Sequence, residues 1–295
     1  MKKGFSLPLW VAGAARSALK KLVGLSFENY EIIKIPNEKK EIKAVILTHS
    51  ETSTGVINDL KTISSYIRAH NTALSIVDCV TSLGACNVPV DEWKLDIVAS
   101  GSQKGYMIPP GLSFISMSQK AWEAAEKSNL PKFYLNLKSY RKSLLSNSNP
   151  YTPAVNLIFA LDEALKMMRE EGLDNIFFRH NKHKLAVSNA TKALNLKLFA
   201  DEKYLSPSIT AIKTGEIDAE EFRKTIKNNF DILLAGGQDH LKGKIFRVGH
   251  LGYVNDRDII TVISAIGNTL LNLGKIKSQQ VGEALVVVSK SLEGN

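Results

Sequence analysis

The feature that most constrains the fold is an alternation of short β-branched segments with helical apolar patterns, which begins at Lys43. Residues 44–47 are predicted as a buried strand, and residues 56–69 carry apolar side chains at helical spacing. Residues 74–77 and 97–99 are predicted as the next strands. Strands that alternate with helices form βαβ units, and such units build mainly parallel sheets. The sequence therefore predicts an α/β fold with a mainly parallel sheet.

The C-terminal part of the chain predicts a smaller α/β domain. Pro153 begins a long amphipathic helix, and Gly172 lies where a helix-ending glycine is expected. We place the domain boundary there, which gives a large domain over residues 1–172 and a small domain over residues 173–295. The further predicted elements are strands at 112–117, 209–212, 232–234 and 245–248, and helices at about 175–194, 218–228 and 256–273.

Composition excludes several classes of protein. Of the 295 residues, 44 % are hydrophobic and 23 % are charged, which is typical of a soluble globular protein. The formal charge is +9, but the lysines are scattered, and aromatic residues do not interleave with them as in a nucleic-acid platform. No apolar stretch approaches the length of a membrane span. We therefore expect neither a nucleic acid nor a membrane as a partner.

The two cysteines and the N-terminus bear on the cellular compartment. Cys79 and Cys86 lack the spacing of zinc ligands, so we expect no metal site and a reduced, cytoplasmic environment. Residues 2–14 imitate a secretory signal, but their apolar core is short and contains Pro8. Residues 15–23 follow with an amphipathic helical pattern. We interpret this end of the chain as part of the folded domain.

Asp78 and Lys104 both lie at predicted strand ends, where open α/β sheets bind their ligands. A lysine amine can form an imine with an aldehyde cofactor, and a carboxylate can keep a pyridine nitrogen protonated. Taken alone, however, a strand-terminal aspartate is more often a turn former, and an isolated lysine is usually a surface charge. These two residues by themselves leave both interpretations open.

A series of motifs, in order along the chain, resembles the class V aminotransferases. The motifs are LTHSETSTGV at 47–56, VDCVTSLG at 77–84, SGSQK at 100–104, PPG at 109–111, PYTP at 150–153 and KIFRVGHLG at 244–252. The chain is most similar to the alanine/serine–glyoxylate aminotransferase branch, which includes cyanobacterial members labelled soluble hydrogenase small subunit. The resemblance runs from about Glu31 to the last helix. It implies the PLP-dependent transferase fold (fold type I), with a mainly parallel large domain and a small C-terminal α/β domain.

The resemblance also implies roles for individual residues. Lys104 would bind pyridoxal 5'-phosphate (PLP) through an imine and then move the substrate proton. Asp78 would pair with the pyridine nitrogen, and Val80 would pack against the ring. Arg247 would bind the substrate carboxylate with its bidentate fork. The remaining cofactor contacts would come from Thr52 at the ring oxygen or the substrate, Gln103 at the phosphate and Thr152 at the phosphate of the partner subunit. The family works as a homodimer, and we expect the same here.

These assignments have structural alternatives. Val80 could be a core residue, Thr152 could cap the following helix, and Arg247 could be a structural ion-pair partner. We interpret His180 and His183 as an exposed helix face and not as a pair of metal ligands.

The chain departs from the family pattern at its N-terminus. Nothing among the residues before Thr48 matches the family's phosphate-binding loop, so we expect an N-terminally shortened member. The implied reaction is transamination between serine or alanine and glyoxylate or pyruvate. The alternative is a non-catalytic subunit. A cysteine desulfurase is less favoured, because Gln103 precedes the lysine where that group usually has histidine.

Overall fold

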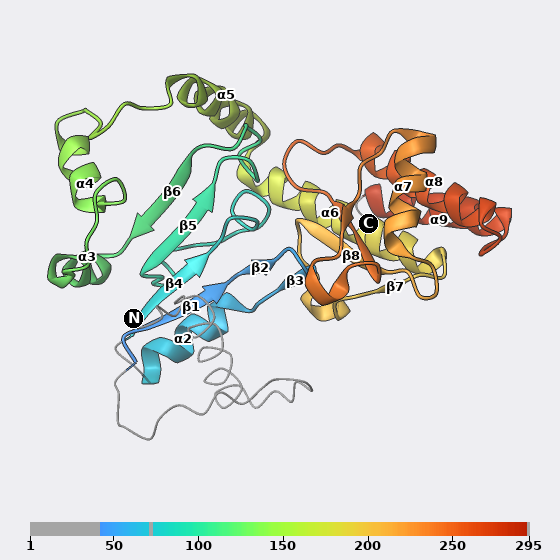
Figure 1. Ribbon diagram of the computed structural model, residues 1–295, viewed down its shortest axis with the longest axis horizontal. Helices are drawn as coiled ribbons and strands as arrows, with labels where there is room; N and C mark the ends of the chain where they lie inside the picture. Colours follow the sequence, from blue (N-terminus) through green and yellow to red (C-terminus); the bar gives the residue numbers. More distant parts are fainter. Residues whose placement is uncertain (1–41, 71–72, 294–295) are drawn as a thin grey trace, which may run out of the picture.

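The computed structural model describes residues 42–70 and 73–293, and Figure 1 shows its two four-stranded sheets with helices around them. The predicted helix at 15–23 and the signal-like segment at 2–14 lie outside the described residues. The first sheet has the strand order β1-β4-β5-β6. Its strands are β1 (Ala44–Thr48), β4 (Leu74–Asp78), β5 (Ile97–Gly101) and β6 (Ser113–Met117). Because β1, β4 and β5 are parallel and only β6 is antiparallel, the predicted mainly parallel sheet is confirmed.

One face of this sheet packs against helix α2 (Leu60–His70). The in-register residues Leu47, Val77 and Val98 point to that face from three adjacent strands. Three helix residues at helical spacing complete the buried cluster: Leu60, Ile63 and Ile67. Burying an aliphatic side chain of this size contributes roughly 2 kcal/mol, and this contact fixes α2 against the sheet.

The helix predicted over residues 56–69 begins later than expected. Its first two residues form β3 (Val56–Ile57), which pairs with β2 (Ser50–Glu51) as an antiparallel hairpin. Asp59 then caps α2, because its Oδ1 accepts the backbone N–H of Thr62 at 3.1 Å. Helical spacing misplaced this boundary, since the apolar hairpin residues continue the same pattern.

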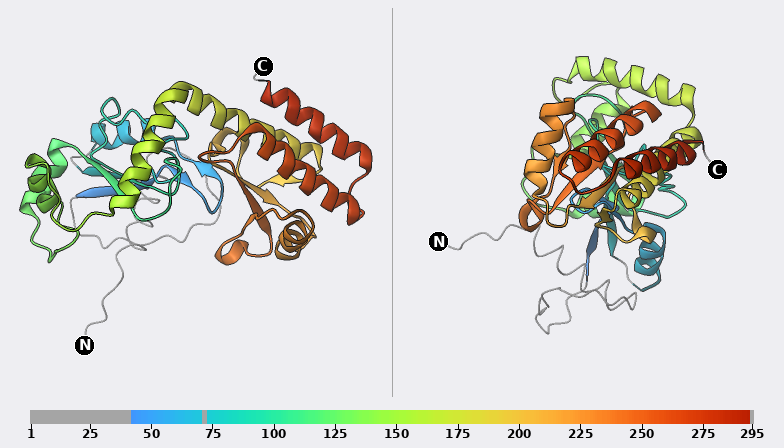
Figure 2. Two further views of the ribbon diagram at one scale, coloured as in Figure 1. Left: turned by 90° about the horizontal axis from the view of Figure 1, so that it is seen from above. Right: turned by 90° about the vertical axis from the view of Figure 1, so that its right-hand side faces the viewer.

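Two long helices connect the first sheet to the second. Helix α5 (Val155–Glu171) lies beside the first sheet, and α6 (Leu173–Ala193) runs into the second part of the molecule (Figure 2). Gly172 is the single residue between them and has φ 82°, a conformation that favours glycine. The predicted domain boundary falls at this link. Two helices that the sequence did not predict precede α5, namely α3 (Gln119–Lys127) and α4 (Leu137–Leu145).

The second sheet is antiparallel throughout, with the strand order β7-β8-β10-β9. Its strands are β7 (Lys197–Leu198), β8 (Ile209–Lys213), β9 (Ala235–Gly236) and β10 (Ile245–Gly249). Apolar residues of this sheet share a buried cluster with α6, α7 (Ala219–Phe230), α8 (Asp256–Asn272) and α9 (Ser278–Leu292). The strand predicted at 232–234 is wrong, because β9 begins at Ala235, and α9 was not predicted. None of the described helices is both long and apolar enough to cross a membrane.

Candidate active site

Asp78 lies at the carboxyl edge of the first sheet, where three parallel strands end together. It is in register with Thr48 of β1 and Ala99 of β5. The backbone N–H of His49 donates to the Asp78 carbonyl at 2.9 Å, which extends the ladder beyond β1. The Asp78 side chain is exposed, and its Oδ1 accepts the N–H of Val80 at 2.9 Å. One carboxylate oxygen thus shapes the turn after β4, and Oδ2 has no partner within the described chain.

Lys104 lies half-buried in the turn between β5 and β6. The fully buried Ser102 joins both ends of this turn, since its Oγ donates to the Pro109 carbonyl at 2.8 Å and accepts the Leu112 N–H at 3.1 Å. Within the turn, the Met107 N–H donates to the Lys104 carbonyl at 3.1 Å. Met107 has φ 62°, which costs a residue with a side chain about 1 kcal/mol. These hydrogen bonds stabilise the conformation of the turn that contains Lys104.

Two glycines bring the Lys104 turn against the turn that follows Asp78. A Cβ on Gly105 would lie 2.2 Å from the carbonyl oxygen of Leu83. A Cβ on Gly84 would lie 3.0 Å from the Gly105 Cα. Since no side chain fits at residue 105, glycine allows the two turns to meet.

Val80 and Gln103 flank Gly101, the last residue of β5. A Cβ on Gly101 would lie 3.1 Å from Gln103 Oε1 and 3.8 Å from Val80 Cγ1. Gln103 is exposed and directly precedes Lys104. The structure therefore gathers four of the predicted site residues at one sheet edge, namely Asp78, Val80, Gln103 and Lys104.

Arg247 on β10 reaches the hairpin that follows β1. Its Nη1 donates to the Thr52 carbonyl at 2.7 Å, and its Nε donates to the Gly236 carbonyl at 2.8 Å. The hairpin docks on the second part of the molecule through Ser50, whose Oγ lies 2.8 Å from Ser206 Oγ. The structure thus joins two predicted site residues that lie 195 positions apart in the sequence.

The guanidinium of Arg247 is buried and only partly hydrogen-bonded within the described residues. Burial lowers the pKa of this group, the nearby charge of Arg223 adds to the shift, and Glu51 opposes it. Among the described residues no carboxylate lies within ion-pair distance of Arg247, so the ion-pair alternative lacks a partner there. Two carbonyls fix Nε and Nη1, and no hydrogen bond joins Nη2 to another residue in the described part of the chain.

Thr152 lies apart from the other predicted site residues. It is exposed, and no hydrogen bond joins it to them within residues 42–70 and 73–293. Helix α5 has Ala154 as its N-cap and no side-chain cap, so the alternative in which Thr152 caps the helix is wrong. Its role at the phosphate of a partner subunit stays a prediction.

The interpretation of His180 and His183 as an exposed helix face is wrong. The two side chains are 1 % and 0 % exposed, because α6 packs against other elements on several sides. His183 Nε2 lies 2.8 Å from Asp256 Oδ1. Burial lowers the pKa of both histidines, that of His180 to about 4. In the described part of the chain, no three His, Cys, Asp or Glu side chains are grouped to hold a metal ion.

Sequence reasoning missed the residues that position Lys104. Ser102 stands in the SGSQK motif, yet roles were assigned only to Gln103 and Lys104 of that motif. The signal that could have found the contact of the two turns is the glycine directly after the lysine, together with Gly84 at the end of the Asp78 motif.

Comparison with known proteins places this geometry in a family. The model of the family described as aminotransferase class-V matches residues 31–242. The chain belongs to the class V aminotransferases, whose cofactor is PLP. It is 60 % identical over 235 residues to a protein of Anabaena cylindrica named soluble hydrogenase 42 kDa subunit, covering 80 % of this chain and 61 % of that relative.

Two further relatives carry aminotransferase names. The serine–glyoxylate aminotransferase of Methylorubrum extorquens is 34 % identical, over 90 % of this chain and 70 % of that protein. The crystal structure of the ureidoglycine–glyoxylate aminotransferase of Bacillus subtilis superposes with a TM-score of 0.77 at 33 % identity, covering 84 % of this chain and 65 % of that one. The chain thus has the PLP-dependent fold of type I and spans about two thirds of the length of these relatives.

The described residues fit PLP in three respects. Lys104 supplies an amine, Asp78 supplies an exposed carboxylate, and Val80 supplies an apolar side chain beside them. These are the groups that an aldehyde carbon, a pyridine nitrogen and an aromatic ring require.

Proposed function

We propose that the chain is a PLP-dependent aminotransferase that transfers an amino group between serine or alanine and glyoxylate or pyruvate. The observation that carries this proposal is the contact at Gly84 and Gly105, which holds the turns of Lys104 and Asp78 together at one sheet edge. The names of the Methylorubrum and Bacillus relatives support a small amino acid and glyoxylate as the substrate class.

Lys104 and Asp78 would perform the central steps. Bound PLP supplies an electron sink that weakens the C–H bond at the substrate α-carbon. Lys104 Nζ would hold the cofactor between turnovers and, once substrate displaces it, would take the proton from the α-carbon. Asp78 Oδ2 would accept the N–H of the pyridine ring and keep that nitrogen protonated, while Val80 packs against the ring.

The other residues would orient the ligands. Arg247 Nη2 would bind the substrate carboxylate, since two backbone carbonyls already fix the rest of its guanidinium. Thr52 would contact the ring oxygen or the substrate, and its carbonyl accepts a hydrogen bond from the same arginine. Gln103 would donate to the phosphate, and Thr152 would do so across a homodimer interface.

A trapping experiment tests this function. The purified protein is mixed with PLP and reduced with borohydride, and the modified peptide is identified by mass spectrometry. We expect the pyridoxyl group on Lys104 and its loss in Lys104→Ala, whereas Lys224→Ala on the exposed face of α7 should be modified as wild type. Absence of any adduct in the wild-type chain would refute the proposal.

A second candidate function is that of a non-catalytic subunit. The observation in its favour is the 60 % identity to a relative named as a hydrogenase subunit, of whose length this chain spans 61 %. Stable co-purification with other hydrogenase polypeptides, with no pyridoxyl adduct on Lys104, would favour this function over transamination.

The cysteines disfavour a desulfurase. Such an enzyme needs a reactive thiolate, but burial raises the pKa of Cys79 to about 11 and that of Cys86 to about 12. Both are free thiols, which supports our proposal of a cytoplasmic location.

A further inference from the structure

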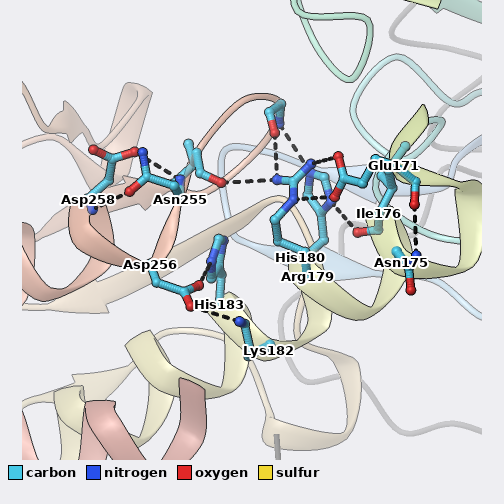
Figure 3. Close-up of polar contacts among 12 residues, drawn as sticks. Glu171, Asn175, Ile176, Arg179, His180, Lys182, His183, Asn255, Asp256 and Asp258 are labelled. Atoms are coloured by element: carbon cyan, nitrogen blue, oxygen red, sulfur yellow. Dashed lines mark hydrogen bonds and ion pairs between the residues drawn. The ribbon is translucent and has the colours of Figure 1, made fainter. Parts of the chain in front are cut away.

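Gly252, in the loop after β10, is held by two neighbouring side chains of α6. These side chains are Arg179 and His180, and Figure 3 shows them beside Glu171. Arg179 Nη1 donates to the Gly252 carbonyl at 2.8 Å and to the Val254 carbonyl at 3.0 Å. His180 Nε2 accepts the Gly252 N–H at 3.1 Å. The carbonyl and the N–H of Gly252 are therefore both hydrogen-bonded to side chains of α6.

The opposite side of Gly252 faces the Lys104 turn. A Cβ on Gly252 would lie 3.3 Å from the Lys104 carbonyl oxygen and 3.5 Å from Met107 Cγ. Gly252 also has φ 85°, which favours glycine. The loop after β10 thus lies between α6 and the backbone of Lys104.

The tautomer of His180 follows from its two contacts. Its Nδ1 lies 2.7 Å from the Ile176 carbonyl, which can only accept, so Nδ1 carries the proton. Nε2 is then the acceptor that the Gly252 N–H requires. His180 is 1 % exposed, so no water replaces either contact without local opening.

The other side of the Arg179 guanidinium is held by Glu171. Its Nε donates to Glu171 Oε1 at 2.6 Å, and its Nη2 donates to Glu171 Oε2 at 3.0 Å. This bidentate pair connects the last residue of α5 with α6 and aims Nη1 at the Gly252 carbonyl. The guanidinium is therefore pre-oriented before it meets the loop.

We propose that Arg179 and His180 are positioning residues that set the place of the Lys104 backbone by holding Gly252 against it. The proposal rests on the proposed function of Lys104, but its geometry belongs to the chain without cofactor. Neither side chain reaches the sheet edge itself, and both act through the loop.

Hydrogen exchange of the cofactor-free protein tests the proposal directly. The amides of Met107 and Ile108 are hydrogen-bonded within the Lys104 turn, so their exchange reports its opening. In Arg179→Met and His180→Leu we expect these amides to exchange about tenfold faster. His180→Gln keeps an acceptor where Nε2 lies and a donor for the Ile176 carbonyl, and it should restore exchange to within about twofold of wild type.

The matched control is Lys182→Met. Lys182 lies on the same helix and pairs with Asp256 Oδ2 at 2.9 Å, but it does not contact Gly252. We expect wild-type exchange in its Lys104 turn. Should His180→Leu fail to fold, Arg179→Lys can replace it in the exchange measurement. Lysine keeps the positive charge but lacks the planar guanidinium that contacts both Glu171 and Gly252. Unchanged exchange at Met107 and Ile108, with faster exchange at the loop around Gly252, would overturn the proposal.

Borohydride trapping with PLP separates this proposal from the proposed function. If the wild-type chain gives an adduct at Lys104, Arg179→Met should need a higher PLP concentration for half-maximal adduct. If the wild-type chain gives none, the proposed function fails, and the exchange measurement still decides whether Arg179 and His180 hold the turn.

Discussion

In the part of the chain up to Gly172, the Lys104 turn is held by backbones that touch at glycines. Beyond Gly172, one buried histidine and one arginine hold the loop after β10. A backbone contact at Gly105 excludes any side chain but contains no group that titrates. The polar network around His180 requires an unprotonated Nε2, because this atom accepts the Gly252 N–H. We therefore expect the first part to be destabilised most by a side chain at residue 105, and the second part to be destabilised most by acid.

The largest expected effect is that of acid on the second part. The usual histidine pKa is 6.5, but burial lowers it to about 4 in His180 and to about 3 in His250. Between pH 6.5 and the lowered pKa of each histidine, the unfolded chain binds a proton that the folded chain does not. The free energy of unfolding therefore falls as pH decreases. Each such histidine removes about 1.4 kcal/mol per pH unit below 6.5.

Urea unfolding at pH 7.5 and pH 5.5 measures this loss, and hydrogen exchange shows where it occurs. In the first part only His49 has a comparably lowered pKa among the described residues, about 4 through burial. Amides of α6 and β10 should therefore lose protection before those of β1 and β4. In His180→Gln we expect the free energy of unfolding to depend less steeply on pH, by the contribution of one histidine, about 1.4 kcal/mol per pH unit. An unchanged pH dependence in that variant would contradict the assignment.

A methyl group at residue 105 should have the next largest effect. Gly105→Ala places a Cβ against the Leu83 carbonyl, and we expect about 3 kcal/mol of destabilisation or separation of the two turns. Gly282→Ala is the matched control, because its Cβ meets nothing within 4 Å and helix α9 gains about 1 kcal/mol. Thermal unfolding of both variants, with trapping at Lys104, gives the comparison. Equal stability of the two variants would refute the close contact.

Arg247→Lys tests the contact between the two parts. Lysine cannot donate to two carbonyls and a carboxylate with fork geometry, so we expect the KM for the amino donor to rise about tenfold, with a smaller change in kcat. The pyridoxyl adduct at Lys104 should persist. Loss of the adduct together with the activity would show that Arg247 holds the fold and does not bind substrate.

The smallest effect concerns the thiols. Because burial raises the pKa of Cys79 and Cys86, iodoacetamide at neutral pH should leave both unmodified in the folded chain and label both in urea. Intact mass measurement distinguishes the two results. Rapid labelling of the native protein would restore the desulfurase alternative.

Much of the fold was predictable because its long elements have strong periodicity. The strands β1, β4 and β5 and the helices α6 and α8 follow apolar patterns whose residues are buried in the two main cores. Helix α5 was predicted from the same kind of pattern, although only Ala164 and Met168 are buried in it. The two-residue strands β2 and β3 are too short for a pattern. Helix α9 contains Gly282, a residue of low helix propensity, which weakens its helical signal.

The candidate site was predictable in part for a similar reason. Asp78 and Lys104 follow buried strands, and the order of the strands brings their ends to one edge. The contacts of Gly105 with Leu83 and of Arg179 with Gly252 join distant segments. No local pattern encodes such a contact, and the burial of His180 follows only from the packing of α6.

The single-residue link at Gly172 has a mechanical consequence. Helix α6 has 21 residues and is roughly 31 Å long at 1.5 Å per residue, so it acts as a lever arm. A rotation of about 10° at Gly172 would displace its far end by roughly 5 Å. The carboxylate of Glu171 and the guanidinium of Arg179 bridge this joint and brace it. One ion pair across a single-residue link thus opposes rotation of α6 relative to α5.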